Sequence, residues 1–435
     1  MLKWNRKLLP VILLTLILLG ACSIKQEPAT TSSLVPADPP APSTAQIDGT
    51  STPSETTTEG ILPPVETVDP NTDFKPAWAG QTRAPGIVTE TPYTASVFAK
   101  GLDSPWGIAS LPDGRFAVTQ KAGQMVIIGT DGSISEPVTG FPEVESSGQG
   151  GLLDVLPAED FDVSRTLYFT LSERTSEGSL TAAGKGRLAD DETTIEEFTI
   201  LFRAIPVTSG RNHYGSRLDF DHEGHLLMTT GDRQSQETRM MAQELDNGLG
   251  KILRITTDGM PVSDNPFTEN AGALSEIYSY GHRNVQGLAV HPETHEIWIS
   301  EMGPQGGDEL NLIESGKNYG WPIISYGEEY SGSPILDGIA VMDGMEQPRY
   351  YWDPVVAPSG MVFYDHDRIP EWQNNLFITS LRGQHILRLI LDGHDAVGEE
   401  RLLTEEGERF RDITVSSDGA LYAITDSGLV YRVGS

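Results

Sequence analysis

Arg115-Phe-Ala-Val-Thr119 is the first of six short apolar runs that end in Thr or Ser and follow a turn-forming stretch. The other five are Thr166–Thr170, His225–Thr230, Glu296–Ser300, Asn375–Thr379 and Ala420–Thr425. Strand units repeated at this spacing predict a β-propeller, whose loops at the strand ends gather around one axis. If the runs are the innermost strands, the residues that follow them face a common mouth.

The length and the strand pattern predict the number of blades. Residues 86–435 accommodate six blades of roughly 50–60 residues with about four strands each. Apolar runs such as Met125–Ile128, followed by the turn Thr130-Asp-Gly132, indicate buried strands, and Leu429–Val433 indicates a final strand that pairs with the first blade. Helical periodicity is rare, with Glu237–Leu245 the best candidate. We therefore predict an all-β, six-bladed β-propeller, and an array of β-sandwiches is the main alternative.

Residues 1–21 have the pattern of a lipoprotein signal peptide. A basic start precedes the apolar run Leu8–Leu19, which is short for a membrane span, and small residues then precede Cys22. Cys22 is the chain's one cysteine, so we expect lipid attachment there, and several acyl chains on one residue anchor firmly. An uncleaved anchor helix is the alternative. Ser23 favours an exported protein held on the outer membrane and facing the periplasm.

The next segment, residues 22–85, is rich in Ser, Thr and Pro and has almost no aromatic residues. Such a composition cannot bury enough apolar surface to offset the entropy lost on ordering. We therefore expect a disordered tether between the anchor and a catalytic propeller domain at residues 86–435.

The charge of the chain excludes one class of partner. The formal net charge is −32, and removal of the three basic residues of the signal makes it −35. A nucleic-acid partner is excluded because such proteins need a basic surface. In so acidic a chain, a local group of arginines is informative.

His213 and Asp232 are the first candidate pair. His213 lies in Gly210–Gly215 just before a predicted strand, and Asp232 ends the following strand. A hairpin return brings the two together, and a carboxylate on one imidazole nitrogen makes the other nitrogen a better base. A solitary surface or core histidine is the alternative.

A second candidate is a hard-cation site in the segment Glu301–Leu310. Gly303 and Pro304 offer backbone carbonyls, and Asp308 and Glu309 offer carboxylates, which are the oxygen ligands that calcium prefers. The spacing is not that of an EF-hand. A solvated acidic loop is the alternative.

The third candidate is an anion site built from arginines. Arg283 and Asn284 lie in a Gly-bounded loop, and Arg382, Arg409 and Arg411 fall in the last two predicted blades. Converging guanidinium groups suit a ligand with planar carboxylates, and ion pairs with neighbours such as Glu408 and Asp412 are the alternative.

Two further motifs complete the candidate site. Gly148-Gln-Gly-Gly151 permits close approach of the backbone to a ligand, and Tyr350-Tyr-Trp352 suits stacking on a sugar or flat cofactor, or else core packing. A base, a hard cation and an anion clamp together suit removal of a proton from an alcohol while a hydride leaves its carbon. An electrophilic cofactor has to receive that hydride.

These motifs resemble those of the soluble quinoprotein glucose/sorbosone dehydrogenases, most closely the bacterial aldose sugar dehydrogenases, from about Phe98 to Arg432. The blocks that carry the resemblance are Gly148–Leu152, Gly281–Gly287, Ser300–Pro304, Asn318–Pro322 and Arg409–Asp412. The resemblance implies a propeller that holds pyrroloquinoline quinone (PQQ) and calcium, and that oxidises the C1 hydroxyl of an aldose to a lactone. The electron acceptor is unknown.

The resemblance also implies roles for single residues. His213, oriented by Asp232, would take the hydroxyl proton, the hydride would pass to the quinone C5, and Arg283 with a calcium ion would stabilise the negative charge on the quinone oxygen. The implied ligands of that calcium are the carbonyls of Gly303 and Pro304, those of a second, structural calcium are Glu309 and the Tyr319 carbonyl, and the implied cofactor contacts are Gln149, Arg283, Asn284, Asp308, Arg382, Arg409 and Arg411.

The sequence departs from the glucose-oxidising relatives at Arg382, where they have Lys. The aromatic segment Tyr350–Trp352 aligns with an offset of one residue, so no sugar contact is assigned to it. Two other functions on a propeller compete with the dehydrogenase: a calcium-dependent lactonase, and a non-catalytic module that binds a carbohydrate or a protein.

Overall fold

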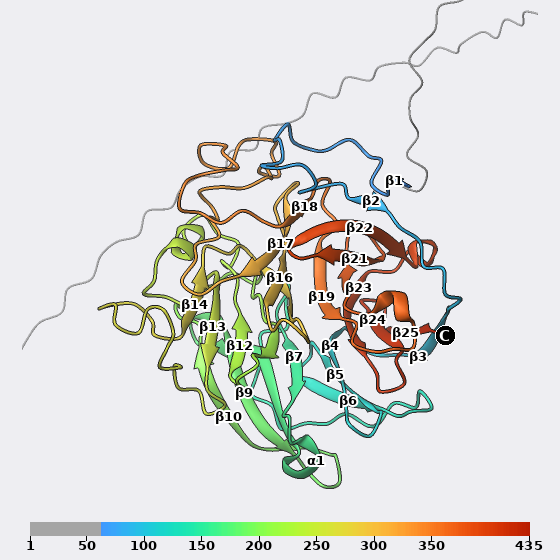
Figure 1. Ribbon diagram of the computed structural model, residues 1–435. Helices are drawn as coiled ribbons and strands as arrows, with labels where there is room; N and C mark the ends of the chain where they lie inside the picture. The colour runs from blue at the N-terminus through green and yellow to red at the C-terminus, as the bar shows by residue number, and fades with distance from the viewer. Residues whose placement is uncertain (1–61) are drawn as a thin grey trace, which may run out of the picture. The chain divides into compact units, whose positions relative to one another are not determined.

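The computed structural model describes residues 62–435, which form six β-sheets arranged as the blades of a ring (Figure 1). The predicted signal peptide, Cys22 and most of the predicted tether lie outside the described residues. Within residues 62–435, no helix has the length and apolar character needed to cross a membrane. The six-bladed propeller is confirmed, and the β-sandwich array is excluded because the sheets surround one axis.

Each of the first five blades is built from antiparallel strands that follow one another in the chain. The first three blades are β4 (Pro105–Ser110), β5 (Phe116–Gln120) and β6 (Gln124–Ile128); β7 (Leu152–Pro157), β8 (Thr166–Thr175), β9 (Gly178–Leu188) and β10 (Ile195–Arg203); and β11 (Leu218–Phe220), β12 (Leu226–Thr229), β13 (Lys251–Ile255) and β14 (Ile277–Tyr280). The fourth and fifth are β15 (Val285–Val290), β16 (Ile297–Glu301), β17 (Asp308–Ile313) and β18 (Tyr350–Trp352); and β19 (Pro358–Phe363), β20 (Leu376–Ser380), β21 (Ile386–Asp392) and β22 (Asp395–Leu402).

The sixth blade closes the ring with strands from both ends of the described chain. It contains β23 (Phe410–Val415), β24 (Leu421–Thr425), β25 (Leu429–Gly434) and, at its outer edge, the N-terminal β3 (Thr94–Lys100). The expected closure by the final strand occurs, but β25 stays in the last blade and β3 joins it there, with Gly434 opposite Thr94. The short helices are α1 (Phe161–Ser164), η1 (Arg239–Gln243), η2 (Pro370–Trp372) and η3 (Thr404–Glu406), and η1 lies within the predicted helical segment.

The first strand of each blade lines the axis, because β4, β7, β11, β15, β19 and β23 contact one another in ring order. The six apolar runs therefore form the second strands, β5, β8, β12, β16, β20 and β24, and not the innermost ones as expected. The second strands are apolar throughout because neighbouring blades bury both of their faces. Their C-terminal ends still reach the mouth of the ring.

An ionic layer crosses the axis in the middle of the ring. Arg217, just before β11, pairs with Asp412 at 2.8 Å and Asp154 at 3.2 Å, and its Nε donates to the Gln286 carbonyl at 2.7 Å. The guanidinium also lies 4.2 Å from the ring centroid of Trp106. The Arg217 guanidinium pairs with both carboxylates, so neither buried charge is left without a partner. We call Arg217, Asp154 and Asp412 together the ionic plug.

A segment that we call the strap, residues 62–93, runs along the outside of the fourth and fifth blades (Figure 1). It contains β1 (Leu62–Pro64) and β2 (Pro85–Gly86), and β2 pairs in parallel with β22. The Asp353 carboxylate accepts hydrogen bonds from the backbone of Asn71 and Thr72 at 2.8 and 3.0 Å. Residues 62–85, the described part of the predicted tether (22–85), therefore contact the propeller.

The strap is ordered because it carries the few residues in this part of the chain that can be buried against the propeller. Gln81 is fully buried and donates to the Pro348 carbonyl at 2.8 Å, and Phe74 packs edge-on against Tyr326. The prediction of a tether used the composition of the whole segment 22–85, which is low in apolar residues. This average does not show the few residues that make local contacts.

Candidate functional site

His213 and Asp232 meet at the mouth, as predicted. His213 lies in the loop between β10 and β11, and Asp232 follows the end of β12, so the hairpin return joins them. His213 Nδ1 is 2.7 Å from Asp232 Oδ1, and both side chains are buried. The backbone N–H of His213 donates to Gln149 Oε1 at 2.8 Å, which fixes the histidine from the neighbouring blade.

The surroundings of the pair favour a neutral imidazole beside an ionised carboxylate. Burial and the Arg283 charge lower the pKa of His213, although the hydrogen bond to Asp232 opposes them. Burial raises the pKa of Asp232, but the hydrogen bond and charge of His213, together with Arg283, outweigh it and lower that pKa. The carboxylate therefore accepts from Nδ1–H, and Nε2 is the basic nitrogen.

Trp321 completes this network, although no role was predicted for this residue. Its indole N–H donates to Asp232 Oδ2 at 2.8 Å, while Asp232 Oδ1 also accepts from the Gln234 backbone at 2.8 Å. The indole ring lies under the Arg283 guanidinium, 5.2 Å from its carbon to the ring centroid. Trp321 belongs to the predicted Asn318–Pro322 block, but only the fold brings it to Asp232.

Arg283 and Asn284 lie in the loop between β14 and β15, beside the pair. Arg283 Nη1 donates to the carbonyls of Met302 and Gly303 at 2.8 and 2.9 Å. Asn284 Oδ1 accepts from the Gly215 backbone at 3.1 Å, so this side chain supports the loop that follows His213. The Gly303 carbonyl therefore faces the Arg283 cation and retains one lone pair for a further ligand.

A cavity of about 430 Å³, which we call the mouth cavity, opens beside these groups. Its volume lies in the range of small-molecule sites. Its polar lining includes three cations and one carboxylate, and its lining residues include Trp106, Lys121, Gln149, Gln286, Met302, Arg409, Arg411 and Asp426. Its lining therefore carries a surplus of positive charge although the chain as a whole is strongly acidic.

Of the four predicted arginines, Arg409 and Arg411 line this cavity, and Arg283 and Arg382 do not. Arg409 Nε and Arg411 Nε donate to the same carboxylate, Asp426, at 2.8 and 2.9 Å. Their partner is thus neither Glu408 nor Asp412, which were the alternatives from the sequence. Arg382 is exposed, and its guanidinium has no hydrogen-bond partner within residues 62–435, while its neighbour Leu381 lines the cavity.

Asp308 takes a different place from the expected cofactor contact. It is fully buried, and its carboxylate accepts from the backbone of Gly303 at 2.8 Å and of Val356 and Ala357 at 2.7 Å. Burial raises the pKa of Asp308 to about 7. The residue thus ties the Gly303 turn to the loop before β19 and is absent from the lining of the mouth cavity.

A small cavity lined by Arg283 and two glutamates, which we call the acidic cavity, has a volume of about 10 Å³, room for about one water molecule. Glu301 and Glu309 sit opposite each other on β16 and β17, and both line it, together with Tyr319. Burial, and then the Glu301 charge, raise the pKa of Glu309 well above its usual range. Two carboxylates at one buried point favour a cation, and Glu301 is a candidate ligand that the sequence did not single out.

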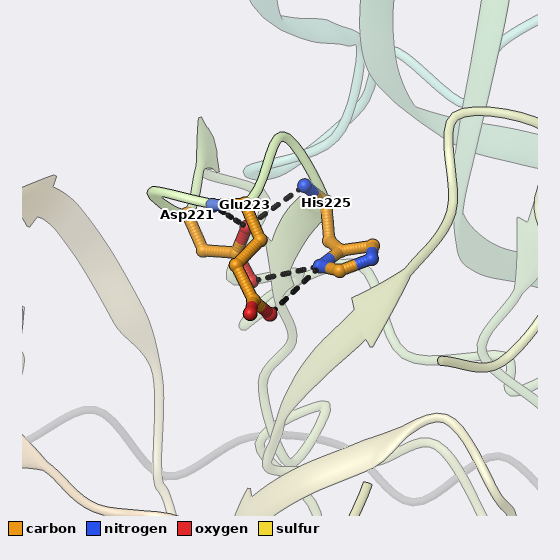
Figure 2. Close-up of side chains that lie close together, drawn as sticks. All are labelled: Asp221, Glu223 and His225. Carbon is orange, nitrogen blue, oxygen red and sulfur yellow. Dashed lines mark hydrogen bonds and ion pairs between the residues drawn. The ribbon is translucent and has the colours of Figure 1, made fainter. Parts of the chain in front are cut away.

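A second group of acidic residues and a histidine has the arrangement of a metal site, but an arginine side chain already pairs with its carboxylates. Asp221, Glu223 and His225 converge in the turn between β11 and β12, at the opposite end of that blade from His213 (Figure 2). Arg254 donates to Asp221 at 2.6 Å and to Glu223 at 2.5 Å. The guanidinium supplies the positive charge there, so the three side chains form an ion-pair network.

The remaining motifs have structural roles. Tyr350, Tyr351 and Trp352 are buried in β18, and Tyr351 stacks on Tyr326 with centroids 4.1 Å apart, as the core-packing alternative expected. The glycines of Gly148–Gly151 approach other protein atoms closely, and Gly148 also lines the mouth cavity. A side chain at Gly148 would meet the Arg211 backbone, and one at Gly151 would meet Lys121.

The fold and the site together define a six-bladed propeller with a buried His–Asp pair beside a positively charged cavity. The model of the glucose/sorbosone dehydrogenase family matches residues 102–432, and the chain belongs to this family. It is therefore an oxidoreductase of the sugar dehydrogenase class, and the resemblance seen in the sequence is confirmed.

Individual relatives agree with this assignment. The aldose sugar dehydrogenase of Escherichia coli (strain K12) is 42% identical over 337 residues, which cover 76% of this chain and 90% of that protein. A crystal structure of a glucose dehydrogenase is 43% identical, covers 79% of this chain and 99% of its own, and has a TM-score of 0.76. The PQQ-bound aldose sugar dehydrogenase of Streptomyces coelicolor is 27% identical, with a TM-score of 0.65, and covers 80% of this chain and 99% of its own.

Proposed function

We propose that this protein oxidises the C1 hydroxyl of an aldose to a lactone, with PQQ as the hydride acceptor and with calcium. The observation that carries the proposal is the His213–Asp232 pair, which Gln149 connects to the mouth cavity. The PQQ-bound Streptomyces coelicolor enzyme supports the choice of cofactor.

The mouth cavity fits a flat polyanion. Lys121, Arg409 and Arg411 exceed the single carboxylate Asp426 by two positive charges, and guanidinium groups bind planar carboxylates. Trp106 adds an aromatic surface. When bound, the quinone supplies a two-electron acceptor for hydride. Gln149, Arg409 and Arg411 would hold it, Asn284 would support the loop at its side, and exposed Arg382 could turn toward it.

The chain's own residues handle the proton. His213 Nε2 takes the proton of the C1 hydroxyl as the C–H bond gives up its hydride and the C=O bond forms. Asp232 stabilises the imidazolium that results, and Trp321 holds Asp232 in place. Arg283 adds a fixed positive charge beside the reacting groups, and a preorganised charge of this kind lowers the barrier where negative charge develops.

The acidic cavity fits the structural calcium. Glu301, Glu309 and Tyr319 would hold the ion, which would neutralise two carboxylates that otherwise repel each other. A second calcium, at the cofactor, would take the carbonyls of Gly303 and Pro304. The Gly303 carbonyl has one lone pair left for it after Arg283.

The export of the protein is part of the proposal. Cleavage before Cys22 and acylation of that residue would anchor the enzyme to the outer membrane, with the propeller facing the periplasm. Substitution of Cys22 by Ala should abolish labelling by a radioactive fatty acid in growing cells, and retention of the label would contradict the proposed anchor.

Reconstitution tests the activity. Cofactor-free protein with PQQ and calcium should reduce an artificial electron acceptor when an aldose is added. His213→Ala should lose turnover and keep the absorption band of the bound quinone, because the base acts in chemistry more than in binding. His366→Ala, remote from the mouth, is the control. Wild-type turnover by His213→Ala would refute the proposal.

Two other functions would give different results in the same assays. Lactone hydrolysis by cofactor-free protein would favour a calcium-dependent lactonase, although a neutral lactone does not need the positive lining of the mouth cavity. Tight carbohydrate binding without quinone uptake would favour a non-catalytic module.

A further inference from the structure

Arg233 is a buried arginine without an acidic partner, next to the proposed base. Its side chain is 1% exposed, its backbone has a φ of 66°, and it forms no salt bridge within the part of the chain that the structure describes. Its guanidinium lies over Tyr214, with 3.4 Å from the guanidinium carbon to the ring centroid. Nε and Nη1 have no hydrogen-bond partner among residues 62–435. Burial of a charge with so few partners is costly.

Arg233 contacts the loop that carries His213, residues 210–214, and this loop is itself held by β9. Nη2 donates to the Gly210 carbonyl, and the backbone N–H donates to the His213 carbonyl at 3.3 Å. Tyr214, under the guanidinium, bonds in turn to Ser179 on β9 at 2.7 Å. Arg233 therefore grips residues 210–214 at three points, directly after Asp232 in the chain.

The charge of Arg233 also acts on His213. The charged groups that face the imidazole are Asp232, which favours its protonation, and Arg283 and Arg233, which oppose it. Gln149, from the neighbouring blade, is neutral and contacts only the backbone of His213. A positive charge close to an imidazole favours the free base.

We propose that Arg233 is a positioning residue for His213: it clamps residues 210–214 against the end of β12 and places a second buried positive charge beside the imidazole. This inference rests on the proposed role of His213 as the base. The clamp holds the loop that carries His213 in place, and the charge keeps Nε2 unprotonated.

The first test uses cofactor-free protein and is independent of any activity. The pKa of His213 is measured by NMR of histidine-labelled protein, with its resonance assigned by loss in His213→Gln. Arg233→Met should move this pKa upward, and Arg233→Lys, which keeps the charge, should leave it near the wild-type value. Arg254→Met, a buried arginine at the other end of the same blade, should leave it unchanged.

The second test uses protein reconstituted with PQQ and calcium. Arg233→Met should lower kcat with little change in KM, shift the acid limb of the pH profile upward, and still take up one quinone per chain. Arg233→Lys should restore most of kcat. Equal His213 pKa values in the wild type, Arg233→Lys and Arg233→Met would overturn the inference.

If Arg233→Met does not fold, Arg233→Gln replaces it, since Gln retains a donor for the Gly210 carbonyl without the charge. Equal pKa values in the Lys and Gln variants would then overturn the inference. Absence of aldose oxidation by the wild type refutes the proposed function instead, and the NMR comparison still decides whether Arg233 acts on His213.

Discussion

The hydrogen bond from Trp321 to Asp232 can be measured by a double-mutant cycle. Trp321→Phe removes the donor that Asp232 Oδ2 uses and leaves the buried carboxylate with His213 and the Gln234 backbone. A hydrogen bond to a charged group contributes about 1.5–3 kcal/mol, and leaving such a group unsatisfied when buried costs a similar amount. We therefore expect Trp321→Phe to cost about 1.5–3 kcal/mol more in the wild type than in an Asp232→Ala background.

The assay is equilibrium unfolding of the cofactor-free protein in urea for the two single variants and the double variant. Trp298→Phe is the matched control, since Trp298 is fully buried and its indole N–H has no partner within residues 62–435. Its cost should be the same in both backgrounds. A coupling energy for Trp321 below about 0.5 kcal/mol, the level expected for independent sites, would refute the reasoning.

Three further predictions concern stability. Burial lowers the pKa of His385 from 6.5 to about 4, so the unfolded chain binds a proton that the folded protein does not, and stability falls as the pH drops from 6.5 toward 4. His385→Asn should lose about 2–3 kcal/mol less than the wild type between pH 7 and pH 4.5, measured by urea unfolding, and equal losses would contradict this. Chelation of calcium should lower the unfolding temperature of the wild type but not of Glu309→Gln, in which one of the two facing carboxylates is neutral; a similar shift in both would exclude the acidic cavity as the ion's place. Deletion of residues 1–92 should lower the unfolding temperature relative to deletion of residues 1–61, because only the longer deletion removes the contacts of the strap with Asp353 and Tyr326, and identical melting curves would count against that role.

The blade pattern could be predicted because it is local. An apolar run after a turn, such as Arg115–Thr119, marks a buried strand wherever it lies in the ring. The same run does not reveal its distance from the axis, because that depends on which strand is first in the sheet. The runs were therefore placed one strand too close to the axis.

The site residues also differ in whether their partners are close in the sequence. His213 and Asp232 could be paired from the sequence because a single hairpin joins them. Trp321 could not be given a role, since its partner Asp232 follows a strand of another blade that only the closed ring brings to it. Glu301 faces Glu309 across a single hairpin, so the same local signal could have paired these two residues. Asp308 shows the reverse case, because its acidic side chain predicted a ligand contact while three backbone N–H groups already satisfy it.

The ionic plug on the axis has a kinetic consequence. A hollow of about 290 Å³ lies on the far side of Arg217, Asp154 and Asp412, while Trp106 and Gln286 face the mouth cavity on the near side. These paired charges lie between the two spaces, so on the proposed function we expect sugar, lactone and electron acceptor to enter and leave through the mouth cavity alone. On the proposed function, we expect the acceptor to wait for the lactone to depart, which gives parallel lines in double-reciprocal plots and inhibition by excess sugar.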